Sequence, residues 1–515
     1  MDRVGRMSTS VTRRTVLATA AATGAAILAP APAEATTRSA LADLEAKIKE
    51  GMARYGIPGV AVGLHHRGRD HLLGYGVTDL ADPHPVDGDT VFRVGSTSKT
   101  FTGTAIMRLV ERGKLDLNRT VRSYLPDFRT TDAAASARVT VRQVLQHSAG
   151  WLGDFFLDTG ADEGALARYV SGMSRLPQLT APGTTFAYNN AALSLAGRLI
   201  EVATGRPYEH AVRTLLTDPL GLDSSAFFLA DLPGARVATP HTLTPAGELI
   251  VDPAAFAMPR SLHPAGGLIS SARDQLRWAR FHLGTGGRLL SSRSMRLMQS
   301  HPGPGGTLFV ELDGVGVTWM LRPTAEGPRV VQHGGDWAGQ HSGFLMVPER
   351  DFAITVLTNS DTGPVLLGEL FADDWVLSRF AGVHNLPAEP RLLPGDELAG
   401  YAGRYVIEQI DFDGQPVSAS FELVPDAGRL LIRLDDGTAG GWLVFYRRDY
   451  VLEMAPDGSY GPTRDNFVRN ADGSVGWLRL SGRLLRRTPL GSTPPAAARS
   501  ARPMRFPVST LPYPL

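Results

Sequence analysis

Lysine is rare in this chain, and one of the few lysines stands three residues after a serine. The sequence contains 52 Lys and Arg residues, and its lysines are Lys47, Lys49, Lys99 and Lys114. Arginine stays protonated in proteins, whereas burial or neighbouring charge readily lowers the pKa of a lysine. Residues i and i+3 share one face of a helix, so the side chains of Ser96 and Lys99 can meet. The pair could therefore supply a nucleophilic hydroxyl and the base that removes its proton.

A second segment, residues 182–190, offers another candidate base. The Tyr188 phenol normally titrates near pH 10, and a lysine cation beside it would lower that pKa. The side-chain amide of Asn190 could hold Lys99 and a substrate carbonyl. Taken alone, Lys99 could be a solvated lysine near the start of a helix, with no partner role for Ser96. Likewise, Tyr188 could be a packed aromatic residue in a loop and Asn190 an ordinary turn asparagine. The sequence leaves open whether Lys99, Tyr188 or both remove the proton from Ser96.

Five segments together resemble the β-lactamase-related serine hydrolases, which include class C β-lactamases, D-alanyl-D-alanine carboxypeptidases, D-aminopeptidases and esterases. The resemblance covers about residues 38–385, and its segments are 96–99, 139–150, 182–190, 266–271 and 333–335. It implies acyl transfer through Ser96, with Lys99 and Tyr188 as the other catalytic residues. It also implies an oxyanion hole made by the backbone N–H groups of Ser96 and Asp336.

The last of these segments departs from the family's Lys-Thr-Gly strand, which offers an ammonium and a hydroxyl to a substrate carboxylate. This chain has His333, Gly334 and Gly335 at those positions. A histidine with an ordinary pKa near 6.5 is mostly uncharged at neutral pH. We therefore expect neutral esters or D-aminoacyl amides to be better substrates than β-lactams. The residues expected to bind the substrate are Asn190, His333, Gly335 and Asp336.

The remaining histidines do not indicate a metal site. We expect His147, which ends a helix in the family pattern, to fix the following turn. His65, His66, His71 and His341 lack acidic partners at metal-ligand spacing. The chain has no cysteine, which excludes thiol catalysis, disulfides and cysteine-ligated metals. We expect no cofactor and no metal.

The elements that must position these residues follow from hydrophobic periodicity. Helices are expected over residues 41–55, 139–145, 193–203 and 275–283, and a further helix follows Ser96 and ends at Gly113. Strands are expected over 57–64, 72–77, 330–332, 343–347 and 353–358. With the resemblance, this predicts an α+β domain over residues 38–385, with an antiparallel sheet flanked by helices in an α/β sandwich. A helical subdomain completes the β-lactamase/transpeptidase-like fold, and we expect the site at the junction of the two.

The composition of the sequence changes after residue 385. Residues 386–396 are rich in proline and predict a linker. Short alternating runs separated by Asp-Gly turns then predict a C-terminal all-β barrel-like domain over residues 397–490, with strands at 404–407, 418–424, 429–434, 442–446, 450–454, 475–480 and 483–487. The domain resembles the small barrels of D-aminopeptidase-like members, and it could either pack passively or line the active site. Residues 491–515 form a tail rich in Pro, Ala and Arg, with little structure expected.

The N-terminus has the pattern of a twin-arginine signal peptide over residues 1–35. Arg13 and Arg14 precede an apolar stretch at residues 16–29, and Ala33-Glu34-Ala35 offers a cleavage site. The apolar stretch is shorter than the roughly 20 residues of a spanning helix. We therefore expect export to the periplasm or beyond, and no membrane span in the mature protein. The net charge of +1 gives no reason to expect binding to nucleic acid.

These observations predict an exported serine hydrolase that forms an acyl-Ser96 intermediate. Its expected partner is a small-molecule or peptide substrate: a D-amino-acid peptide, a cell-wall-like amide or a small ester. A β-lactamase or D-Ala-D-Ala carboxypeptidase is the alternative of the same class. The alternatives of other classes are a penicillin-binding receptor without turnover and a non-catalytic binding protein, although the latter should have lost Ser96, Lys99 or Tyr188. The sequence predicts no oligomeric state.

Overall fold

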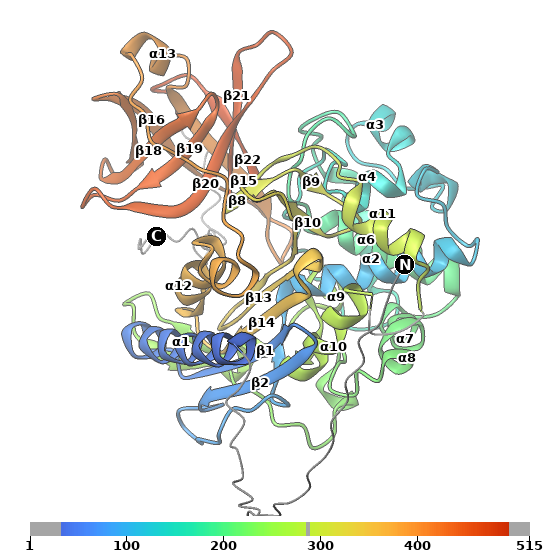
Figure 1. Cartoon of the computed structure of the whole chain (residues 1–515). Helices are drawn as coiled ribbons and strands as arrows, with labels where there is room; N and C mark the ends of the chain where they lie inside the picture. Colours follow the sequence, from blue (N-terminus) through green and yellow to red (C-terminus); the bar gives the residue numbers. More distant parts are fainter. Residues whose placement is uncertain (1–31, 285–288, 494–515) are drawn as a thin grey trace, which may run out of the picture.

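The computed structural model describes residues 32–284 and 289–493. Its first domain is built on an antiparallel sheet with the strand order β2-β1-β14-β13-β11-β10-β9, and β12 pairs with β13 (Figure 1). The strands are β1 (Gly59–His66), β2 (Arg69–Gly76), β9 (Gly314–Val315), β10 (Met320–Arg322), β11 (Val330–Gln332), β12 (Gly335–Trp337), β13 (Gln340–Val347) and β14 (Phe352–Thr358). The predicted strands lie within this sheet, and the short strands β9, β10 and β12 were not predicted.

Helices cover both faces of the sheet, as Figure 1 shows. On one face, α1 (Pro32–Tyr55) and α12 (Gly363–Leu367) pack on apolar side chains such as Val60 and Val62 of β1. On the other face, Ala61 belongs to a separate core with Trp278 of α10 (Ala272–His282). Because β1 is buried along its whole length, its first six residues, 59–64, are a continuous apolar run without alternation. The predicted α+β sandwich is confirmed.

A helical subdomain lies beside the sheet and includes the two helices that begin at the predicted site. Helix α6 (Asn190–Thr204) begins where the Asn189 side chain accepts a hydrogen bond from the Ala192 N–H, and it ends at Gly205 in the left-handed region. Helix α2 (Ser98–Glu111) packs against α6 and α9 (His263–Gly266). The other helices of the first domain are α3 (Ala133–Arg138), α4 (Val141–Leu145), α5 (Ala165–Gly172), α7 (Tyr208–Val212), α8 (Asp218–Leu220) and α11 (Ser292–Ser300), whereas α13 (Gly395–Ala399) packs on the second domain.

Three two-stranded sheets complete the first domain. The sheet that pairs β3 with β6 lies next to the predicted site, because β3 leads directly into the turn that carries Ser96. The strands are β3 (Val91–Arg93) with β6 (Ile269–Ser271), β4 (His241–Leu243) with β5 (Leu249–Val251), and β7 (Gly306–Leu308) with β8 (Val310–Leu312).

The second domain is a closed antiparallel barrel, which confirms the predicted all-β module. Its strands are β15 (Gly403–Ile410), β16 (Pro416–Asp426), β17 (Arg429–Leu434), β18 (Ala439–Arg447), β19 (Tyr450–Met454), β20 (Tyr460–Arg469), β21 (Val475–Leu480) and β22 (Arg483–Thr488). Every predicted run is a strand, but β20 was missed. This strand contains Gly461 and Pro462 and buries Thr463, Asp465 and Asn466, so it lacks the apolar alternation that marks a strand.

Most of the predicted signal peptide and of the predicted tail lies outside the described residues, and the proposed cleavage site after Ala35 falls in the first turn of α1. The predicted domain boundaries stay predictions. Within residues 32–284 and 289–493, no helix is both long and apolar enough to cross a membrane.

Candidate active site

Ser96 and Lys99 meet at the start of α2, as their spacing predicts. Ser96 lies in the 3-10 turn Gly95–Thr97, directly before the helix. The Lys99 Nζ donates hydrogen bonds to Ser96 Oγ at 2.8 Å and to the Ala265 carbonyl at 2.6 Å. Ala265 directly precedes the predicted segment 266–271, and the Leu268 N–H donates to Ser98 Oγ at 2.9 Å. That segment therefore holds the first turn of α2 in place.

The surroundings of Lys99 favour its neutral form. Its side chain is fully buried, and burial, followed by the Arg483 guanidinium, holds its pKa well below the ordinary value of 10.5. The carboxylates of Asp154 and Asp336 oppose that shift without cancelling it. A neutral amine hydrogen-bonded to a serine hydroxyl is the arrangement that a general base needs.

Tyr188 lies beside the pair but is held in its protonated form. The Lys99 Nζ is 4.9 Å from the centre of the tyrosine ring. Burial raises the pKa of the phenol, and the Arg483 guanidinium and a hydrogen bond with Ser96 reverse only part of that rise. Burial therefore acts in opposite directions on the two candidate bases: it favours the neutral form of Lys99, which can accept a proton, and the protonated form of Tyr188, which can donate one.

His147 fixes the segment that carries Tyr188, in agreement with its expected structural role. Its backbone has φ +52°, and its carbonyl accepts a hydrogen bond from the Ala187 N–H at 2.9 Å. Its Nδ1 accepts a hydrogen bond from the Asn189 N–H at 2.8 Å. The imidazole also stacks on the Tyr188 ring, with 4.7 Å between ring centres. The helix end at residue 147 and the segment around Tyr188 are thus joined through one buried side chain.

Asn190 does not hold Lys99 in the way the sequence suggested. Within the described part of the chain, its amide donates to Asp154 Oδ1 at 2.7 Å. The other oxygen of Asp154 accepts from Arg483 Nε at 3.1 Å. The prediction was wrong on this contact, because the buried carboxylate of Asp154, a strong acceptor, holds the Asn190 amide instead. Neither Asp154 nor Arg483 was singled out from the sequence.

Two glycines allow β12 to run against the turn that carries Ser96. A Cβ on Gly335 would clash with the Val94 carbonyl and the Ser96 nitrogen. A Cβ on Gly95, which has φ +51°, would lie 2.6 Å from the Asp336 nitrogen. The turn with Ser96 and the strand β12 with Asp336 are therefore in direct backbone contact. An oxyanion hole made by the N–H groups of Ser96 and Asp336 would need these two segments to be adjacent.

The sequence is similar to those of known serine hydrolases. The family model described as Beta-lactamase matches residues 44–374. Penicillin-binding protein 4 of Amycolatopsis lactamdurans is 34% identical over 359 residues, which are 67% of this chain and 92% of that protein. The chain belongs to the β-lactamase family. This membership makes it a serine hydrolase of the β-lactamase fold.

Further similar proteins include an esterase and a structure that also covers the second domain. Esterase EstB of Burkholderia gladioli is 31% identical over 232 residues, which are 42% of this chain and 58% of that protein. The crystal structure of SurE matches 88% of this chain and 100% of its own, with 25% identity and a TM-score of 0.66. A class C β-lactamase from Rhodobacter sphaeroides shares the fold over 63% of this chain, with a TM-score of 0.51.

In this β-lactamase-family hydrolase, the position of the usual lysine carries an uncharged imidazole. His333 is buried, and its Nδ1 bonds to the Gly334 carbonyl at 2.7 Å. Burial, followed by the nearby Lys99, lowers the pKa of His333 to about 3. Its ring centre is 6.2 Å from that of Tyr188, so the side chain lies at the site. It brings no positive charge there at neutral pH.

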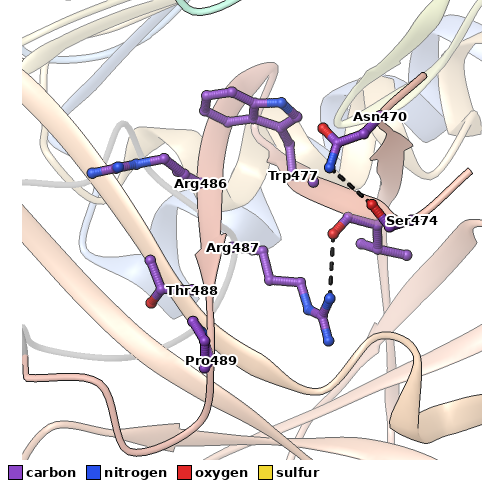
Figure 2. A pocket seen from close by; sticks show the side chains of 9 residues that line it. Asn470, Ser474, Trp477, Arg486, Arg487, Thr488 and Pro489 are labelled. Carbon is purple, nitrogen blue, oxygen red and sulfur yellow. Dashed lines mark hydrogen bonds between the residues drawn. The ribbon is translucent and has the colours of Figure 1, made fainter. Parts of the chain in front are cut away.

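Cavities elsewhere on the molecule do not coincide with this site. Figure 2 shows a cavity of about 480 Å³ on the barrel, with Trp477, Arg486 and Arg487 in its wall. A second cavity of about 360 Å³ lies between the domains, next to Leu152 and Leu484. Neither wall contains a predicted catalytic residue. Among the described residues, no cluster of three or more His, Cys, Asp or Glu side chains could hold a metal ion.

A buried histidine braces the strand that carries Asp336. The His341 Nδ1 bonds to Asp336 Oδ1 at 2.8 Å across the β12–β13 pair. Asp361 lies on the other side of the ring and accepts hydrogen bonds from the Gly339 and Leu243 N–H groups. Burial lowers the pKa of His341, but the hydrogen bond with Asp336 and the nearby Asp361 carboxylate, whose Oδ1 is 3.9 Å from Nε2, outweigh it and raise that pKa to about 9.

This brace predicts a pH-dependent loss of stability in a His341→Gln variant. A group with a raised folded-state pKa stabilises the protein fully below its unfolded pKa near 6.5 and ceases to do so above the folded value. With a folded pKa of about 9, the stabilisation is on the order of 3 kcal/mol at pH 6. Urea unfolding of both proteins between pH 6 and 10 should give a difference that shrinks as the pH rises. A difference independent of pH would show that the charge of His341 is not involved.

Proposed function

We propose that this hydrolase cleaves its substrate through an acyl-Ser96 intermediate with Lys99 as the first base. The observation that supports this most strongly is the 2.8 Å hydrogen bond between Lys99 Nζ and Ser96 Oγ in a buried site. As Ser96 Oγ bonds to the substrate carbonyl carbon, its proton passes to the neutral Lys99. The oxyanion so formed would accept hydrogen bonds from the Ser96 and Asp336 N–H groups.

The remaining steps return the site to its starting state. The leaving group departs with its bonding electron pair and takes a proton from Lys99, directly or through Tyr188. Water then attacks the acyl-Ser96 carbonyl carbon and gives its proton to Lys99, and the second tetrahedral intermediate collapses to release the acid. Ser96 Oγ recovers the proton from Lys99, so the amine is neutral again.

The substrate class that we propose is a neutral ester or an amide of a D-amino acid, including D-residue peptides and cell-wall-like amides. The uncharged His333 and the lack of a hydroxyl at Gly334 provide a poor receptor for a carboxylate at this strand. The relatives agree with this choice, since one is an esterase and SurE has been solved with D-Leu. The similarity to penicillin-binding protein 4 favours the second candidate, a β-lactamase or D-Ala-D-Ala carboxypeptidase.

We also propose that the protein is exported by the twin-arginine route. The proposal rests on Arg13, Arg14 and the apolar stretch that follows them in the sequence. An enzyme whose substrate lies in the cell wall or outside the cell would require such an export signal. Cleavage after Ala35 would shorten α1 at its first turn and leave the residues that pack on the sheet, such as Leu44 and Ile48, in place.

A substrate panel tests the proposed function. We expect kcat/KM for p-nitrophenyl acetate or D-Ala p-nitroanilide to exceed that for a chromogenic cephalosporin by about one to two orders of magnitude. The reason is that the strand with His333 and Gly334 cannot make a charge-assisted hydrogen bond to the cephalosporin carboxylate, worth roughly 1.5–3 kcal/mol, and the Arg483 guanidinium is already paired with Asp154. A reversed preference would favour the β-lactamase alternative. Stoichiometric acylation without turnover of any substrate would identify a receptor instead.

A further inference from the structure

One hairpin of the barrel reaches into the site of the other domain. Strands β21 and β22 are joined by Ser481 and Gly482, whose φ angles are +47° and +78°, as in a tight hairpin turn with two left-handed residues. The Gly482 carbonyl accepts a hydrogen bond from the Tyr188 N–H at 2.8 Å. A Cβ on Gly482 would lie 3.3 Å from the Tyr188 Cβ. The turn therefore lies directly against Tyr188.

The hairpin is anchored from both domains next to its turn. In the barrel, Asp465 accepts a hydrogen bond from the Ser481 N–H at 3.1 Å. Arg479 donates to Asn466 at 2.7 Å within the barrel and to the Phe186 carbonyl of the first domain at 3.0 Å. These buried contacts fix the position of the turn relative to the segment that carries Tyr188. The barrel thus lines the site, which was one of the two roles that the sequence left open.

The first residue after the turn is Arg483, and its guanidinium lies among the catalytic side chains. Its carbon is 4.6 Å from the centre of the Tyr188 ring. Its Nε donates to Asp154 Oδ2 at 3.1 Å, and only 13% of its side chain and 5% of that of Asp154 are exposed. Asp154 in turn holds the Asn190 amide. Arg483 is therefore part of a buried chain of contacts that ends at Asn190.

We propose that Arg483, which the barrel supplies, is a positioning residue for acyl transfer. It fixes Asp154 and keeps Lys99 ready to accept the Ser96 proton. The inference rests on the function proposed above. Arginine cannot lose its proton in a protein, whereas a buried lysine can. When both lie beside one tyrosine ring, the lysine is the group that becomes neutral. Without Arg483, the pKa of Lys99 would rise and the amine would hold its proton at neutral pH.

The charges around Lys99 determine the direction of this effect. The titratable groups that face it are Asp154, Asp336, His147, His333, Tyr188 and Arg483. Both histidines are buried with lowered pKa values, so they are neutral. Asp154 and Asp336 favour the protonated lysine, and Arg483 opposes it. Arg483 acts twice, because it repels a charged Lys99 and also neutralises Asp154.

The test is the pH dependence of kcat/KM for p-nitrophenyl acetate in Arg483→Met, Arg483→Lys and the wild type. The acidic limb of this profile reports the pKa of the catalytic base in the free enzyme. We expect the methionine variant to move that limb to higher pH by about one unit or more, with activity recovering in alkali. The lysine variant, which keeps the charge, should restore most of the wild-type limb. Arg448→Met is the matched control, since Arg448 is 76% exposed at another hairpin of the same barrel.

A second substitution predicts a shift of the opposite sign. Asp154→Asn removes an anion that favours protonated Lys99, so its acidic limb should move to lower pH. It also keeps the proposal testable if Arg483→Met does not fold. A folded Arg483→Met variant that loses activity equally at every pH would overturn the inference, since packing alone would explain the loss. If wild-type protein is not labelled by a fluorophosphonate at Ser96, the proposed function itself fails.

Discussion

Ser96→Ala should lower kcat/KM for an ester on the order of 10⁶-fold, which is the scale of nucleophile removal in a serine hydrolase. The residual rate would come from binding and from the backbone N–H groups at residues 96 and 336. The variant should still fold, because Ser96 is only partly buried and the Lys99 amine keeps its bond to the Ala265 carbonyl. Few other single substitutions in this chain should combine so large a kinetic loss with an intact fold.

Intact-protein mass spectrometry after treatment with a fluorophosphonate is the direct measurement. Wild type should gain one adduct, and Ser96→Ala should gain none. Ser292→Ala provides the control, because Ser292 is an exposed serine at the start of α11. An adduct of equal yield on Ser96→Ala, or near wild-type hydrolysis by it, would place the nucleophile elsewhere.

The features that the sequence predicted well are those that depend on neighbours along the chain. The Ser96–Lys99 contact needs only the i, i+3 spacing, which the 3-10 turn leading into α2 also provides. Helix α6 has its cap at Asn189 and its left-handed glycine at residue 205, and both are visible as residue types. The apolar run of β1 and the alternating strands of the barrel are also local patterns. Strand β20 was not predicted because most of its buried side chains, Phe467 excepted, are polar.

The features that the sequence could not predict depend on partners that are distant in the chain. Asn190 was expected to hold Lys99, yet its acceptor is Asp154. The partner of Asp154 is Arg483, 329 residues further along. Neither residue belongs to a motif, and only the docking of the barrel brings them together. The fold of each domain was predictable, whereas the packing of one against the other required the structure.

The choice between Lys99 and Tyr188 as the base was also beyond the sequence, because it depends on burial. Both side chains are buried, but burial lowers the pKa of an amine and raises that of a phenol. Burial thus favours the neutral amine of Lys99, which can act as a base, and disfavours the phenolate of Tyr188. Composition cannot show this, since the same two residues in a solvated loop would keep their ordinary values.

Lys99→Arg should cost at least about a hundredfold in kcat, the low end of a general-base contribution, although the formal charge of the residue is kept. The Lys99 amine makes bonds of 2.8 and 2.6 Å in a fully buried site. A guanidinium there would stay protonated and could not accept the Ser96 proton. For the same reason, raising the pH should not restore activity to this variant, whereas a variant that merely raised the pKa of Lys99 would recover in alkali.

Single-turnover acylation of Lys99→Arg between pH 6 and 10 separates these outcomes, with thermal unfolding as the check that the buried guanidinium is tolerated. Lys49→Arg is the matched control, since Lys49 is 60% exposed and pairs with Glu45 on the surface of α1. The control should acylate at the wild-type rate at every pH. Near wild-type acylation by folded Lys99→Arg would remove Lys99 from the proton transfer. Tyr188 would then be the remaining candidate base, despite the burial that keeps it protonated.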